Sequence, residues 1–92
     1  MKKIKLPIFR RILSSECKII YPGGRALIST GFSIKRKSRV SSIDDLVIKY
    51  GIQVGASTID DRGELQILLF NHSIDHVFKI SPGDEIANLI NL

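Results

Sequence analysis

Residues 51–92 read GIQVGASTIDDRGELQILLFNHSIDHVFKISPGDEIANLINL, and this stretch decides the fold. It contains three short runs rich in β-branched and other apolar residues, at 66–70, 77–80 and 85–90. Such runs favour strands, and clusters of polar turn residues, at 71–73 and 81–84, separate them. The pattern therefore predicts three consecutive antiparallel strands.

A tight polar turn, Asp-Asp-Arg-Gly at 60–63, precedes the first of these strands. It connects that strand to the apolar residues 52–56, which predicts a hairpin. Polar side chains on a loop held by a rigid scaffold often carry function, so we expect chemistry here. A purely structural turn is equally consistent with the residues, because aspartate close to glycine is common turn chemistry. The sequence leaves both interpretations of Asp60 and Asp61 open.

One helix is predicted over residues 42–51. Its apolar residues recur at the spacing i, i+3, i+4, i+7, at Ile43, Leu46, Val47 and Tyr50. Ser42 with Asp45 three residues later fits a capping box at the start of the helix. Gly51 suits the C-terminal cap, because glycine readily adopts a positive φ.

The net charge points to an anionic partner. The chain has 92 residues, enough for one domain, and a formal net charge of +5. Four of the five residues at 35–39 are basic, and Lys37 and Arg39 are the two we single out as candidate ligand contacts. A solvated hairpin tip would have the same composition. Without aromatic neighbours this cluster lacks the stacking platform of a single-strand groove, so we expect no nucleic-acid partner.

The cysteine count and the hydropathy pattern indicate a cytoplasmic protein. Cys17 is the only cysteine, so no disulfide can form within the chain. Cysteine and histidine residues show no spacing typical of a metal site. The chain has neither an apolar run of membrane-spanning length nor the apolar segment of a signal peptide, so we expect no membrane contact.

Several short landmarks together are similar to the trimeric dUTPase family, which shares its fold with the dCTP deaminases. They occur in the family order, at 22–31, 54–56, 59–60, 62–64, 69–71 and 83–90, where Gly83-Asp84-x-Ile86-Ala87-x-Leu89-Ile90 is the longest. The resemblance implies an all-β fold, a small dUTPase-like barrel of the β-clip or jelly-roll type with one short helix. It implies a single domain over residues 1–92 and a homotrimer with clefts between subunits.

The chain also departs from the family pattern. The first motif, Ala-Gly-x-Asp, has no counterpart, and neither has the C-terminal glycine-rich arm. At the helix start the family has Pro-Arg-Ser-Gly, whose Arg and Ser meet the triphosphate, whereas residues 42–45 are Ser-Ile-Asp-Asp. Two carboxylates there would repel phosphate. The hairpin turn at 60–63 is two residues shorter than in the family and lacks its tyrosine.

Some functional positions are retained. The resemblance implies that Asp60 matches the aspartate that orders the attacking water, and that Asn88 replaces a glutamine that touches phosphate. Because several phosphate-binding groups are missing, we expect a non-catalytic protein that binds or sequesters a nucleotide-like ligand at inter-subunit clefts. The expected ligand contacts are Asp60, Arg62, Arg39, Lys37 and Asn88.

Two alternatives stay open. One is a protein-interaction module built on the same scaffold, with a protein as partner. The other is a minimal active dUTP diphosphatase in which Asp60 is catalytic and the triphosphate carries Mg²⁺. In the non-catalytic case we expect no cofactor.

Overall fold

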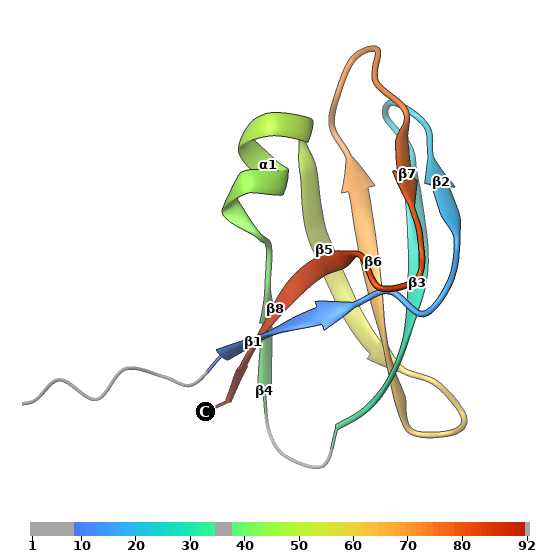
Figure 1. The fold of residues 1–92 in the computed structure, drawn as a ribbon, viewed down its shortest axis with the longest axis vertical. Helices are drawn as coiled ribbons and strands as arrows, with labels where there is room; N and C mark the ends of the chain where they lie inside the picture. Colours follow the sequence, from blue (N-terminus) through green and yellow to red (C-terminus); the bar gives the residue numbers. More distant parts are fainter. Residues whose placement is uncertain (1–8, 35–37, 92) are drawn as a thin grey trace, which may run out of the picture.

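The computed structural model describes residues 9–34 and 38–91, which form strands and one short helix (Figure 1). The strands are β1 (Phe9–Leu13), β2 (Lys18–Ile20), β3 (Arg25–Ser33), β4 (Ser38–Ser41), β5 (Ile52–Ile59), β6 (Glu64–Asn71), β7 (Phe78–Ile80) and β8 (Glu85–Asn91). The helix α1 (Asp44–Tyr50) lies between β4 and β5. The predicted all-β fold with one short helix is confirmed.

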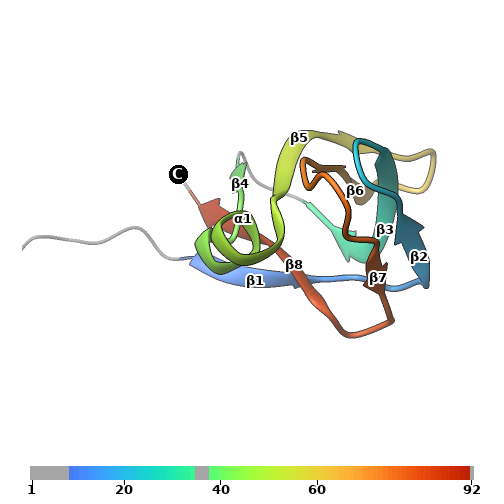
Figure 2. The same cartoon turned by 90° about the horizontal axis from the view of Figure 1, so that it is seen from above.

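The strands form three small antiparallel sheets, with the orders β1-β8-β4, β2-β7 and β3-β6-β5. The three runs expected as consecutive strands are β6, β7 and β8, and each belongs to a different sheet. The expectation was therefore right about the strands and wrong wherever it implied that they pair with one another. Each instead pairs with a strand from the first half of the chain (Figures 1 and 2).

The three sheets share one apolar core. Strand β6 shows how the core is built, because its side chains alternate between half-buried and fully buried positions, as period-two geometry requires. Its buried side chains are Leu65, Ile67, Leu69 and Asn71. They pack with apolar residues from the other strands, namely Ile12, Ile20, Ile28, Ile52, Ile80, Ile86, Ala87 and Leu89.

Asn71 is the polar member of this core, with only 1% of its surface exposed. Its amide nitrogen donates to the carbonyl oxygens of Ile20, at 2.9 Å, and His76, at 2.8 Å. Its carbonyl oxygen accepts from the backbone N–H of Ser73 at 3.0 Å and from the Ser73 hydroxyl at 2.7 Å. One side chain therefore ties the end of β6 to β2 and to the loop that precedes β7.

The helix starts differently from the prediction. Ile43 is its N-cap residue and no side chain caps it, so the expected capping box is wrong. The reason is that the Ser42 hydroxyl accepts a hydrogen bond from the backbone N–H of Val54, at 2.9 Å, and so links the helix start to β5. The C-terminal cap is confirmed, since Gly51 has φ of 70° and donates its N–H to helix carbonyls.

Gly55 is required by close packing, not by its backbone angles. It lies at a bulge where β5 pairs with β6, and a Cβ at this position would overlap the aromatic ring of Phe70. We predict that Gly55→Ala destabilises the protein by about 1–3 kcal/mol, because the ring must leave its place. Urea unfolding measures the change. Ala56→Ser adds one atom at the next, exposed position and serves as control; an equal effect of both substitutions would contradict the packing argument.

Glu16 fastens the loop between β1 and β2 to β3. One of its carboxylate oxygens accepts the backbone N–H of Ser29 at 2.6 Å, and the other lies 3.6 Å from the Lys18 ammonium. Burial alone would raise the pKa of the Glu16 carboxyl, but the Ser29 N–H and the Lys18 charge outweigh it and lower that pKa below its ordinary value. The ionised form is therefore stabilised by folding.

A pH dependence follows from this shift. Because the pKa is lower in the folded state, the stabilisation is complete above the unfolded-state value of about 4.3 and is lost as the pH falls through the folded-state value. We predict that Glu16→Gln lowers Tm at neutral pH and that the two proteins converge in strong acid. Thermal melts from about pH 7 to pH 2.5 test this. A gap in Tm that stays constant over that range would refute it.

Candidate functional site

Asp60 organises the turn between β5 and β6. Its Oδ1 atom accepts the backbone N–H groups of Arg62, at 2.8 Å, and Glu64, at 3.0 Å. The backbone closes the same turn, since Asp60 N–H donates to the Glu64 carbonyl and Gly63 N–H to the Asp60 carbonyl. Gly63 has φ of 82°, which few other residues adopt readily. The predicted hairpin is thus confirmed, and Asp60 is held in a fixed orientation.

The electrostatics of Asp60 suit an acceptor that stays ionised. The Glu64 N–H is the main cause that lowers the pKa of this carboxyl; a desolvation effect opposes it, and the Arg62 N–H and guanidinium act in the same direction as Glu64. None of the described residues donates a hydrogen bond to Oδ2. Asp60 therefore combines a structural oxygen with a second oxygen that can accept from water.

The other two predicted basic contacts of this region are less fixed. Arg62 is on the same turn, and its guanidinium lies 3.7 Å from the Glu64 carboxylate with 80% of the side chain exposed. Such an exposed pair restrains an arginine only weakly. Lys37 lies outside the described residues.

Asn88 and Arg39 lie on the other side of the fold, in the sheet β1-β8-β4. Asn88 is opposite Ser41, and Arg39 is opposite Ile90, two residues further along β8. Because side chains repeat with period two, Arg39 and Asn88 face the same side of this sheet. The structure therefore brings these two predicted contacts together.

Arg11 is the functional candidate that sequence reasoning missed. It is directly opposite Asn88 in the β1–β8 pair, and its guanidinium donates to Oδ1 of Asn88 at 2.7 Å. It also lies 3.4 Å from the Glu85 carboxylate. The amide nitrogen of Asn88 faces the Ser42 carbonyl, at 3.4 Å, next to the helix start. The adjacent arginines 10 and 11 in a short strand were a visible signal, but their partner is 77 residues away.

The predicted contacts thus form two groups within one chain. The turn that holds Asp60 and Arg62 projects from the sheet β3-β6-β5, at the lower end of the molecule in Figure 1. Arg39 and Asn88 belong to the sheet β1-β8-β4, and the turn and this sheet lie apart in both views (Figures 1 and 2). A single copy of the chain does not unite them.

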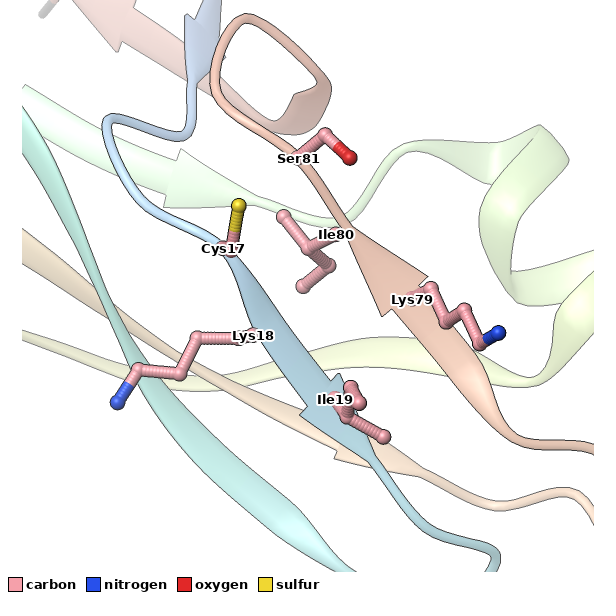
Figure 3. Close-up of a pocket in the computed structure, with 6 residues that line it drawn as sticks. All are labelled: Cys17, Lys18, Ile19, Lys79, Ile80 and Ser81. Atoms are coloured by element: carbon pink, nitrogen blue, oxygen red, sulfur yellow. The ribbon is translucent and has the colours of Figure 1, made fainter.

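A hollow of about 470 Å³ lies over the ribbon of β2 and β7 (Figure 3). Ile19 and Ile80 lie along it, Lys18 and Lys79 point to either side, and Cys17 and Ser81 are at one end, as Figure 3 shows. This hollow contains none of the predicted contacts. It is mainly apolar, and it lacks the acceptors and donors that a phosphate or base would need.

Metal and membrane features are limited. No three His, Cys, Asp or Glu side chains of the described residues are grouped so that they could hold a metal ion. Within the same residues, no helix is long and apolar enough to cross a membrane.

Comparison with known proteins gives a consistent result, although no family model matches the chain. It is 40% identical over 85 residues to a deoxyuridine 5'-triphosphate nucleotidohydrolase of Oryza sativa subsp. japonica, and the match covers 85% of this chain and 49% of the relative. The proteins of the same name from Candida albicans and avian adenovirus 8 are 40% and 39% identical, with 86% of this chain covered and 53% and 52% of the relatives. The chain spans about half the length of these curated relatives.

These relatives contradict the expectation of a non-catalytic protein that sequesters a nucleotide. Each is named for the hydrolysis of a nucleoside triphosphate, at an identity near 40%. The expectation counted lost phosphate-binding groups one motif position at a time. It could not include a cation such as Arg11, which reaches Asn88 only through the pairing of β1 with β8.

Proposed function

We propose that this chain, which belongs to the dUTPase-like superfamily, acts as a dUTP nucleotidohydrolase that converts dUTP to dUMP and pyrophosphate. The observation that carries the proposal is the identity of about 40% over most of the chain to proteins of that name. The geometry of Asp60 is compatible with it, since a fixed carboxylate with one open oxygen is what a water-ordering group needs. The domain comprises residues 1–92.

Asp60 would act on the attacking water. A carboxylate with a lowered pKa is a weak base, so its contribution is to accept a hydrogen bond from the water and aim it at the α-phosphate. Oδ1 is already used by the turn, so the water would bind Oδ2. The two backbone bonds keep this oxygen in place without any movement of the hairpin.

Charge on the phosphates would be balanced from the other group of residues. Arg39 and Asn88 present a guanidinium and an amide on one face of their sheet, and both can donate to phosphate oxygens. Mg²⁺ would arrive bound to the triphosphate, which is its usual way into such sites. The described residues offer no metal cluster of their own, so no step assigned to this chain depends on a protein-bound ion.

The two groups would meet between copies of the chain. In β5, every side chain from Gly55 to Ile59 is exposed, although β5 is part of a sheet and borders it at one edge. An exposed edge strand of this kind is a natural contact surface for another subunit. We therefore place Asp60 of one copy opposite Arg39 and Asn88 of the next in a homotrimer. The single cysteine and the absence of a predicted leader favour the cytoplasm as location.

³¹P NMR tests the proposed reaction. With dUTP and Mg²⁺ present, adding the protein should replace the three triphosphate resonances by those of dUMP and pyrophosphate. UTP and dCTP, offered separately under the same conditions, control for specificity. If the dUTP signals persist at equimolar protein, the proposed function is wrong.

A further inference from the structure

A cavity beside β1 has the composition of an anion site. It has a volume of about 320 Å³ and lies between β1 and the far end of β3, where Gly31 bends the strand with φ of 65°. Arg10 and Arg11 line it from one side, and Thr30 and Phe32 from the other. None of the described residues that line it is acidic.

Both arginines are held in position before any ligand binds. The guanidinium of Arg10 lies over the ring of Phe32, 5.4 Å from its centroid, a cation–π contact. Arg11 is fixed by Asn88, at 2.7 Å, and by Glu85, at 3.4 Å. Fixed donors lose less conformational entropy on binding than free side chains do, which favours recognition by this pair.

Donors and charge remain available after these contacts. A guanidinium has five N–H donors, and Arg11 directs only its Nε and one terminal nitrogen at Asn88 and Glu85. Counting Arg10 and Arg11 as +2 and Glu85 as −1 leaves a local charge of +1. Guanidinium groups bind phosphate through paired hydrogen bonds, so phosphate is the anion that this arrangement fits best.

We infer that this cavity is a binding site for a phosphate group, and that Arg10 and Arg11 are its binding residues. Arg11 connects the cavity to Asn88, so the site would hold the outer phosphates of a nucleotide, or the pyrophosphate released from it. The identity of that ligand rests on the proposed function. The binding of phosphate itself does not.

Isothermal titration calorimetry with inorganic pyrophosphate tests the inference without any turnover. Arg10→Ala and Arg11→Ala should each weaken binding about tenfold or more, because each removes charge-assisted hydrogen bonds. Arg25→Ala is the matched control, since Arg25 is an exposed arginine at the opposite end of β3, and it should change the affinity less than about twofold. Arg11→Gln keeps an amide of similar reach, and it provides a second reading if Arg11→Ala melts early.

Each outcome decides the matter. Wild-type protein that does not bind pyrophosphate at millimolar concentration, or binding that Arg10→Ala and Arg11→Gln leave unchanged, overturns the inference. Pyrophosphate binding that needs both arginines, in a protein that leaves dUTP intact, supports the inference and refutes the proposed function. Hydrolysis of dUTP with pyrophosphate affinity unaffected by either change does the opposite.

Discussion

Asp60→Asn is expected to lower kcat for dUTP hydrolysis about 100- to 1,000-fold, the usual loss when a group that acts in the transition state is removed. Asparagine keeps an oxygen that can accept the Arg62 and Glu64 N–H groups, so the turn should persist. What is lost is the negative charge and the free carboxylate oxygen that would order the water. KM should change much less than kcat, since the hairpin keeps its shape.

The neighbouring carboxylate provides the control. Asp61 is exposed and forms none of the hydrogen bonds that close the turn, so Asp61→Asn should retain kcat within about threefold. Both variants are compared by steady-state kinetics and by thermal melts. Loss of activity in both variants, or retention of kcat in Asp60→Asn, would show that Asp60 has no special role.

Asn71→Ala is expected to cost about 3 kcal/mol or more in the free energy of unfolding. The side chain is 1% exposed and satisfies two carbonyl oxygens, of Ile20 and His76, and two donors of Ser73. Removing it leaves several of these groups unpaired in or near the core, at about 1–3 kcal/mol for each group that stays buried. It also opens a cavity at the end of β6.

Asn88→Ala is the matched substitution at a half-buried asparagine, whose partners Arg11 and Ser42 can turn to solvent. It should cost less than about 1 kcal/mol. Guanidinium chloride unfolding at neutral pH gives both values. If the two substitutions cost the same, Asn71 is not the link between β2, β6 and the loop before β7 that its hydrogen bonds indicate.

Local features of the fold could be predicted from the sequence. The hairpin at 60–63 and the glycine cap at Gly51 depend on residues close in the chain, and both are confirmed. The capping box at Ser42 failed because Val54, twelve residues away, competes for its hydroxyl. The strands β6, β7 and β8 were found, but their partners could not be, since pairing such as Arg10 with Leu89 is a property of the whole chain.

The same limit applies to the candidate site. Asp60 could be singled out because its turn is local, and Arg39 and Asn88 because of their motif positions. That Arg11 contacts Asn88 requires the register of β1 on β8, which no spacing in the sequence reveals. The expectation of a non-catalytic protein failed for a related reason, because it judged the absence of charged groups without knowing which distant ones fold into their place.

Mixing two inactive variants tests most directly whether the site is shared between copies. Asp60→Asn and the double variant Arg39→Ala/Asn88→Ala damage the two separate groups of residues and should each be nearly inactive alone. When they are co-expressed with different tags and purified through both, random assembly should give sites with both groups intact and recover about a quarter of the wild-type rate. A rate no higher than the mean of the two parent variants would contradict a site formed between neighbouring copies.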